Sequence, residues 1–402
     1  MIRKAPFTAV GSLFAGALFL PLAISLGGCG QSHARTPSDA VVKAPTVASR
    51  VVPKVDVTPQ LRLAAQSGHQ QMNVFPAFGR TFVATKGYVA EIVASGLTPR
   101  PELAKGLEAV SGQPIGFYGN FPNDAYTVAI RYGERSESYD VYKWENNAWQ
   151  VSGGDHDGHA QFFTAPDGTL GMFQSYGDAP FMTLDRKPMP SAPKGDGVRY
   201  ASIASISDGI LALEEPQSGH AARIVHWSKT GNKVYYLPVL GIALEHFGVV
   251  QMKAKGSRAM VLGSIGGSDN GTAQAQPYVA AFDGSVWSRI DCPRAMGEPS
   301  VGQLSPDGTL YLRTTSHKAA PGGGDTATEH LWVRPVGGNW SSIDLPTTAS
   351  GAKCWYQDLE ADDHALWLTA SCDNDEGPQH VLFTSHPAYA KGRAPETIRS
   401  TP

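Results

Sequence analysis

From about residue 72 to the C-terminus, short runs of apolar and β-branched residues alternate with tight turns that contain Asp, Asn and Gly. The segment Gln303–Leu312, for example, has the pattern of a strand, a Pro-Asp-Gly turn and a second strand. Related segments recur along the chain, and their equivalent turn residues are Asn123, Asp167, Asp208, Lys255, Asp307 and Asp362. Successive turn residues are separated by roughly 40 to 55 residues, a spacing typical of the blades of a β-propeller.

A second hairpin follows the first in each repeat. It consists of an apolar strand, a tight turn and a strand led by an aromatic residue, as in Val141–Trp149 and Ala281–Pro293. Two hairpins make a four-stranded antiparallel sheet, and radial packing of such sheets buries both faces of each. We therefore expect an all-β domain over residues 72–402, a β-propeller of four-stranded antiparallel blades.

The number of blades is less well defined by the pattern. Six repeats have a recognisable first hairpin, which favours six blades. A further hairpin at Thr81–Val93 either completes the last blade or belongs to a seventh, and a short helix is expected near Pro101. A β-sandwich is the alternative fold, but regular copies over most of the chain are difficult to place in one.

The first 30 residues have a different pattern. Arg3 and Lys4 precede an uncharged, largely apolar stretch from Ala5 to Ser25. A positive start followed by an apolar segment and small residues is the order of a secretory signal. About 20 apolar residues would also just span a bilayer, but the prolines and glycines of the segment and the cysteine directly after it favour a signal.

The tetrapeptide Leu26-Gly27-Gly28-Cys29 at the end of this segment resembles the lipobox of bacterial lipoproteins. The resemblance implies a signal peptide of residues 1–28, cleavage before Cys29 and lipidation of that cysteine. Gly30 stands in place of the aspartate associated with inner-membrane retention, which implies an outer-membrane anchor. Residues 29–71 are rich in Ser, Thr, Ala, Pro and Val, so beyond the lipidated Cys29 we expect a disordered tether.

Composition agrees with these expectations and excludes one class of partner. A content of 42% hydrophobic residues suffices for a buried core, and 44 Gly and 29 Pro suit many short strands joined by turns. The net charge is −3 and no basic run occurs along the chain. Nucleic acid is therefore not an expected partner.

The remaining cysteines predict one disulfide. With Cys29 lipidated, Cys292, Cys354 and Cys372 remain in a compartment where disulfides persist. Cys354 and Cys372 lie at nearly equal distances along the chain from the predicted turn near Asp362, so they should face each other on neighbouring strands. Cys292 occupies the position that an apolar residue holds in the next repeat, and we expect it to be a buried free thiol.

Two clusters of polar residues could hold a metal. Asp155, His156, Asp157 and His159 place two carboxylates and two imidazoles within five residues, enough ligands for a divalent ion. The cluster lies where a connection between blades is expected, so a solvated loop is the simpler interpretation. Residues 373–377 resemble the opening of a calcium loop, but the acidic ligand at its twelfth position is missing.

The function predicted from these features is binding. No motif of a metalloprotease, serine hydrolase or phosphate loop occurs, and no catalytic residue or cofactor is predicted. Variable loops on a rigid scaffold commonly carry binding sites. The candidate loops join the second and third strands of each repeat and span Tyr176–Pro180, Glu214–His220, Gly263–Gln276, Thr315–Glu329 and Ser371–His380.

Two functions remain in view. The favoured one is an outer-membrane-anchored lipoprotein whose propeller is a binding or scaffold module for an envelope protein or glycan. The alternative is an envelope hydrolase or lyase that acts on polysaccharide or peptide with a site in the central channel. Three or more acids, histidines or an arginine cluster at the mouth of that channel would favour the enzyme.

Overall fold

A computed structural model describes residues 59–398 of the chain except for short internal segments. The segments left out are 68–69, 108–112, 133–136, 158–159, 175–179, 190–191, 194–198, 216–221, 239–246, 266–275, 321–323, 348–352, 364 and 375–376. The expected signal peptide, Cys29 and most of the expected tether therefore lie outside the described residues. Within the described residues, no helix is long and apolar enough to cross a bilayer.

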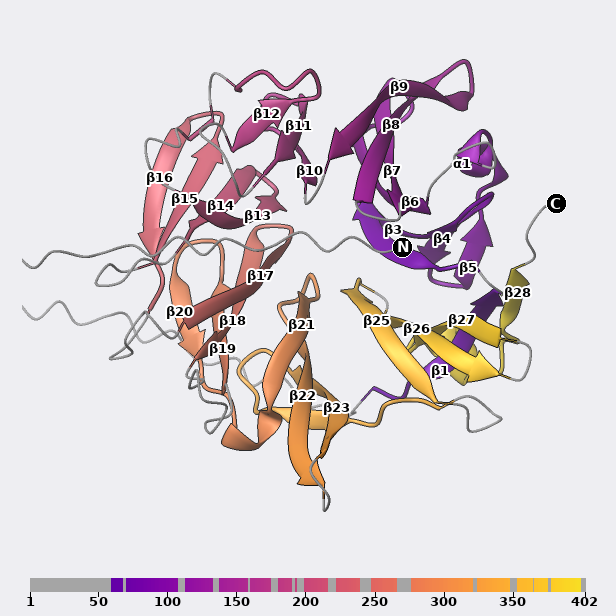
Figure 1. Cartoon of the computed structure of the whole chain (residues 1–402), viewed down its shortest axis with the longest axis vertical. Coiled ribbons are helices and arrows are strands. Elements are labelled where there is room, and N and C mark those ends of the chain that lie inside the picture. Colours follow the sequence, from indigo (N-terminus) through magenta and orange to yellow (C-terminus); the bar gives the residue numbers. More distant parts are fainter. Residues whose placement is uncertain are drawn as a thin grey trace, which may run out of the picture. The chain divides into compact units, whose positions relative to one another are not determined.

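The described residues form seven β-sheets, and in six of them the strands follow one another along the chain (Figure 1). Neighbouring strands in these six sheets are antiparallel, and five of the six have the expected four strands. Sheet 1 comprises β2 (Asn73–Ala77), β3 (Arg80–Thr85), β4 (Tyr88–Val93) and β5 (Gly96–Pro99). Sheet 2 comprises β6 (Gln113–Asn120), β7 (Asp124–Tyr132), β8 (Glu137–Glu145) and β9 (Ala148–Asp157). Sheet 3 comprises β10 (Gln161–Thr164), β11 (Leu170–Phe173) and β12 (Phe181–Thr183). Sheet 3 departs from the expectation, because it has three strands among the described residues.

Sheets 4 to 6 have four strands each. Sheet 4 comprises β13 (Tyr200–Ile206), β14 (Gly209–Glu214), β15 (Arg223–Ser228) and β16 (Gly231–Tyr236). Sheet 5 comprises β17 (Phe247–Lys255), β18 (Arg258–Ile265), β19 (Gln276–Phe282) and β20 (Trp287–Ile290). Sheet 6 comprises β21 (Glu298–Leu304), β22 (Leu310–Ala320), β23 (Gly324–Arg334) and β24 (Ser341–Ile343). The expected hairpin turns are therefore found where the repeat places them. Among the described residues, two short helices also form: α1 (Pro101–Ala104), which begins at the expected proline, and α2 (Pro387–Ala390). A 3₁₀ turn spans Arg294–Met296.

Sheet 7 combines the two ends of the domain. It contains β25 (Cys354–Ala361), β26 (Leu366–Asn374), β27 (Gly377–Thr384), β1 (Arg62–Ser67) and β28 (Glu396–Ile398), in that order. Strand β1 pairs antiparallel with β27 and parallel with β28. The prediction that the tether extends to residue 71 is therefore wrong for β1, because its small residues Ala64 and Ala65 are fully buried and its backbone completes this sheet.

The sheets follow one another around a centre (Figure 1). The first strand of each sheet contacts the first strand of the next, from β2 and β6 through to β21 and β25, and β25 in turn contacts β2. The hairpin at Thr81–Val93 forms β3 and β4 of sheet 1 and does not complete the last sheet. Each sheet therefore has two neighbouring sheets.

A separate apolar cluster lies at each junction between neighbouring sheets. The buried Trp149 packs between sheets 1 and 2, and the buried Trp287 packs between sheets 4 and 5. The half-buried Trp340 packs against the cluster between sheets 5 and 6. These three tryptophans, which come from the second hairpins of their repeats, therefore pack between neighbouring sheets.

Two of the expected loops are strands. Pairing continues from Thr315 with Glu329 to Ala320 with Gly324, so β22 and β23 form one long hairpin. Likewise, β26 and β27 remain paired from Ser371 with His380 to Asn374 with Gly377. The Thr-rich and alternating character of the first segment suits a strand. The central residues of the other three expected loops lie outside the described part of the chain.

Candidate functional site

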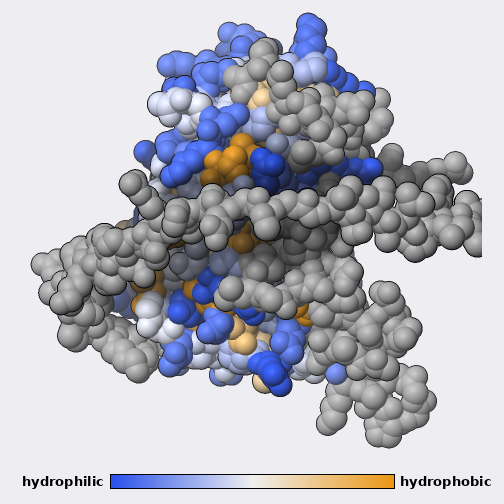
Figure 2. Space-filling model, turned by 90° about the vertical axis from the view of Figure 1, so that its left-hand side faces the viewer, coloured by the Kyte–Doolittle hydropathy of each residue, from blue (hydrophilic) through white to orange (hydrophobic). Residues whose placement is uncertain are grey.

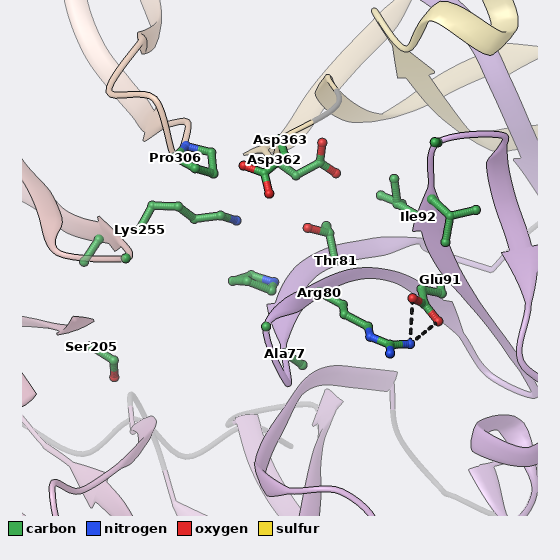
Figure 3. A pocket seen from close by; sticks show the side chains of 16 residues that line it. Ala77, Arg80, Thr81, Glu91, Ile92, Ser205, Lys255, Pro306, Asp362 and Asp363 are labelled. Atoms are coloured by element: carbon green, nitrogen blue, oxygen red, sulfur yellow. Dashed lines mark hydrogen bonds and ion pairs between the residues drawn. The ribbon is translucent and has the colours of Figure 1, made fainter. Parts of the chain in front are cut away.

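The candidate site is a cavity of about 630 Å³ at the centre of the ring, here called the central pocket (Figure 3). Turns of five sheets contribute to it: sheets 1, 4, 5, 6 and 7. Its lining residues are Pro76, Ala77, Gly79, Arg80, Thr81, Glu91, Ile92, Val93, Ala94, Ser205, Ala254, Lys255, Gly256, Pro306, Asp362 and Asp363. Most of the wall is made of small apolar residues, with charged groups between them.

The central pocket opens at the end of the sheets opposite to the expected binding loops. In an antiparallel sheet, the turns after the first and third strands emerge at one end, and the connection after the second strand emerges at the other. The residues that line the pocket lie at the turns after the first and third strands of their sheets. The expectation of a site on the loops between second and third strands therefore does not describe this pocket.

Arginines and a glutamate form an ion-pair network on the wall from sheet 1. The Arg80 Nη1 lies 2.8 Å from Glu91 Oε1 and 3.0 Å from Oε2 (Figure 3). Arg100 donates to the same carboxylate from outside the pocket. The Glu91 side chain is only 8% exposed, so its negative charge is satisfied by protein partners before any ligand arrives.

Lys255 is the cation of the opposite wall. Its Nζ lies 2.7 Å from Glu360 Oε1, and both side chains are largely buried. Gln303 donates from its amide to the second carboxylate oxygen. Burial raises the pKa of Glu360, while the charges of Lys255 and Lys253 and the hydrogen bond from Lys255 oppose that rise. Glu360 itself does not line the pocket.

Two aspartates complete the mouth on sheet 7. Asp362 Oδ1 accepts a hydrogen bond from the Ala365 backbone N–H at 2.9 Å, and Oδ2 accepts one from Trp367 Nε1 at 3.0 Å. The neighbouring Asp363 is exposed and makes no hydrogen bond or ion pair with the described residues. Asp363 is thus a carboxylate of the mouth that a ligand can engage without breaking an internal contact.

The number of acidic groups at the pocket meets the criterion that would favour an enzyme. The ion pairs and hydrogen bonds that these charged groups make within the protein do not favour one. Acids and cations do converge at the central pocket. Arg80, Lys255 and Asp362 are each held by a protein partner, however, and a general acid or base must be within hydrogen-bond reach of its substrate. The arrangement suits a preformed binding surface with an apolar wall and one open carboxylate.

The metal candidates are only partly described. Residues Asp155, His156 and Asp157 lie at the end of strand β9, where His156 pairs with Tyr139 and Asp157 with Ser138, so this part is a strand and not the expected loop. Their side chains, and His159 altogether, lie outside the described residues. Among the described residues, no three His, Cys, Asp or Glu side chains lie together in a group that could hold a metal ion. The middle of the calcium-like segment, residues 375–376, also lies outside them.

The predicted disulfide is confirmed. Cys354 and Cys372 are paired directly across β25 and β26, and their sulfurs are bonded. Cys292 is free and half-buried, and burial raises the pKa of its thiol to about 12. The predicted register of the last repeat is therefore correct at this position.

The sequence predicted the turns but not their convergence. Lys255 stands out among the equivalent turn residues because the other five are Asp or Asn. That departure from the repeat was the available signal for a residue with a special role. Glu360, the partner of Lys255, has no comparable signal because it lies within a strand.

No protein-family model and no curated protein sequence matches the chain. Raptor from Chaetomium thermophilum is similar in structure with a TM-score of 0.45 at 8% identity, over 81% of this chain and 29% of Raptor, so this chain spans under a third of that protein. The β-propeller domain of Swd1 from Myceliophteria thermophila has a TM-score of 0.41 at 11% identity, over 80% of this chain and 98% of that one. The polysaccharide lyase Uly1 has a TM-score of 0.35 at 12% identity, over 66% of this chain and 88% of Uly1. Likenesses this distant say nothing about what the central pocket binds.

Proposed function

We propose that this chain is an outer-membrane-anchored lipoprotein whose domain is a seven-bladed β-propeller, and that its central pocket binds a segment of an envelope protein. The closed succession of contacts between first strands supports the propeller. The lipobox-like segment ending at Cys29 supports the anchor. In this proposal the lipid holds the domain at the membrane, and the pocket recruits the partner.

The observation that carries the binding proposal is the state of the charges in the central pocket. Arg80 and Lys255 are neutralised by glutamates of the protein, which leaves an apolar wall and the open carboxylate of Asp363. A peptide that places an apolar side chain against Ile92 and Pro306 and a Lys or Arg beside Asp363 fits this chemistry. A site that is already formed before binding also loses little conformational entropy when the ligand binds.

The alternative of a hydrolase or lyase requires a group that can exchange a proton with substrate. Glu360 is the acid near the pocket whose pKa is raised, but it is buried and held by Lys255 and Gln303. Binding is therefore the better account of the pocket.

Site-specific photo-crosslinking in the native bacterium tests this proposal. A photoreactive residue at the exposed position 94, at the rim of the pocket, should give a discrete protein adduct, and one at the exposed position 151 on sheet 2 should not. Asp363→Lys should abolish the adduct, whereas Asp291→Lys, a change at an exposed aspartate elsewhere, should leave it. Equal adducts from both positions, or no adduct from position 94, would refute binding at the pocket.

A further inference from the structure

A second cavity, of about 500 Å³, lies between the turns of sheets 4 and 5 and is here called the lateral pocket. It shares no lining residue with the central pocket. Its lining is rich in hydroxyl, amide and charged groups. The residues are Ile206, Ser207, Asp208, His226, Ser228, Thr230, Gly231, Asn232, Lys233, Tyr235, Ser257, Phe282 and Gly284.

The floor of the lateral pocket holds an imidazole whose hydrogen bonding is incomplete. His226 is 8% exposed, and its Nε2 has no hydrogen-bond partner among the described residues. The Asp208 carboxylate is 3.4 Å from Nε2 but not aligned to accept a hydrogen bond from it. A buried polar nitrogen without a hydrogen bond destabilises the fold. The Nε2 atom itself is shielded from solvent, so a ligand hydroxyl would meet the exposed Asp208 carboxylate beside it and donate to that group.

The space around His226 is closed on its inner side. A Cβ added to Gly209 would lie 3.0 Å from His226 Nε2 and 2.2 Å from the Trp227 carbonyl oxygen. Only glycine therefore fits beneath the ring, and this backbone covers the Nε2 edge. Asp208, by contrast, has a side chain that is 68% exposed and can turn toward a ligand.

A cation is positioned on the wall of the same pocket. Lys233 pairs with His226 across strands β16 and β15, so both side chains lie on the same face of sheet 4. The Lys233 Nζ lies 4.6 Å from the centre of the Tyr235 ring, and that ring packs edge-on against Phe282 at 5.1 Å. The ammonium group is thus held over an aromatic ring, where it can donate to a ligand oxygen.

The hydroxyl groups of the pocket add donors and acceptors around this centre. Ser228 Oγ and Thr230 Oγ1 lie 3.0 Å apart, and Asn232 and Ser257 also line the cavity. The lining holds one carboxylate, Asp208, and one ammonium group, Lys233, and their charges cancel, so neither an anion nor a cation finds a surplus of opposite charge there. A ligand with several neutral hydroxyls can both donate to Asp208 and accept from Lys233.

The outer surface at this side of the domain agrees with a polar ligand. Strands β16 and β20 lie at the left of Figure 1, and Figure 2 shows the face on that side. Where its residues are described, hydrophilic side chains dominate, and apolar residues form only small separate patches. A large apolar patch would be typical of a protein-docking surface.

From these observations we infer that the lateral pocket binds a neutral sugar residue of a glycan. This site goes beyond the binding of a protein segment at the central pocket and does not depend on it. One envelope protein could then contact a protein at the centre and a glycan at the side. A single sugar in so open a site should bind with a dissociation constant in the millimolar range, about 4 kcal/mol of binding free energy.

NMR with the mature full-length protein tests the inference. The probes are glucose and N-acetylglucosamine, with acetate and inorganic phosphate as anionic comparisons. Saturation transfer from protein to a sugar should be observed, and the same sugar should shift the Nε2 resonance of His226 in histidine-labelled protein. Failure of both sugars to do so, or binding of the anions in their place, would overturn the proposal.

Variants make the test specific to the pocket. Asp208→Asn and Lys233→Met should each weaken sugar binding at least tenfold, and neither side chain belongs to the buried core. Asp185→Asn and Lys187→Met are matched controls, because these residues form an exposed ion pair in a turn of sheet 3. If the control variants weakened sugar binding equally, the lateral pocket would be excluded as the binding site. The crosslink from position 94 should persist in Asp208→Asn, which separates the two sites.

Discussion

Lys255 and Glu360 form an ion pair between two sheets that are not neighbours, with the Lys255 Nζ 2.7 Å from the Glu360 Oε1. Lys255 belongs to sheet 5 and Glu360 to sheet 7, and Gln303 of the intervening sheet 6 donates to the same carboxylate. Three sheets therefore share one buried polar network beside the central pocket. Because such groups are shielded from water, each depends on its partners.

Removal of Lys255 should leave a buried carboxylate without its cation. Lys255→Met should lower the free energy of unfolding by about 3 to 5 kcal/mol, since an unpaired buried charge is costly. The double variant Lys255→Met/Glu360→Leu should recover much of that loss, because it removes both charges. Urea unfolding measures both values. A double variant as unstable as the single one would show that the charge itself is not the cause.

The raised pKa of Glu360 predicts a pH dependence of stability. The folded protein holds the proton of Glu360 over a pH range in which the unfolded chain has lost it. This contribution is fully present below the ordinary glutamate pKa of about 4.3 and is lost as the pH rises through the folded value. The stability of wild type relative to Glu360→Gln should therefore fall as the pH rises from about 4. A constant difference across that range, measured by urea unfolding, would contradict the shift.

The disulfide between Cys354 and Cys372 should stabilise the last sheet. It closes a span of 18 residues, for which the chain-entropy model gives about 3 kcal/mol. Replacement of both cysteines by alanine should lower the free energy of unfolding by this amount, as measured by urea unfolding. Cys292→Ala is the control and should have a smaller effect, because that thiol is half-buried and unbonded. Peptide mapping without reductant would contradict the assignment if it linked Cys292 to either residue.

Strand β1 should be essential for a stable sheet 7. A chain that begins at residue 70 lacks β1 and loses its pairing with both β27 and β28. At about 1 kcal/mol for each lost hydrogen bond, the truncation should lower stability by several kcal/mol, whereas a chain that begins at residue 57 should be as stable as the full chain. Thermal unfolding followed by circular dichroism compares the two. Equal melting temperatures would show that β1 is dispensable.

Cys29 carries the proposed lipid anchor. Cys29→Ser should abolish the incorporation of labelled fatty acid and release the protein from the membrane fraction, because no other thiol is predicted to be lipidated. The control is Cys292→Ser, which should remain lipidated. Fatty-acid labelling of the Cys29→Ser protein would contradict the resemblance to a lipobox.

The features that could be predicted from sequence are those set by local pattern. The turn at Asp307 is specified by Ser305, Pro306 and Gly308 around it, and the Asp307 side chain accepts from Thr309 N–H within the same turn. The Cys354–Cys372 pairing follows from the position of one such turn. Both depend on residues that are close in sequence.

The features that were missed depend on residues far apart in the chain. Strand β1 has the composition of a linker, and its partner β27 comes from the other end of the domain. The Lys255–Glu360 pair and the central pocket require the sheets to be placed around a common centre. A repeat pattern specifies each sheet but not how the sheets are placed relative to one another.

The place of β1 between β27 and β28 has a consequence for the order of folding. Ribosomes make β1 first and its two partners last, so the final sheet cannot be completed until nearly the whole chain has been synthesised. Contacts of such high sequence separation form slowly. In the export that we propose, the chain must stay unfolded until it has crossed the membrane, and this topology would delay closure of the domain until its C-terminus is available on the far side.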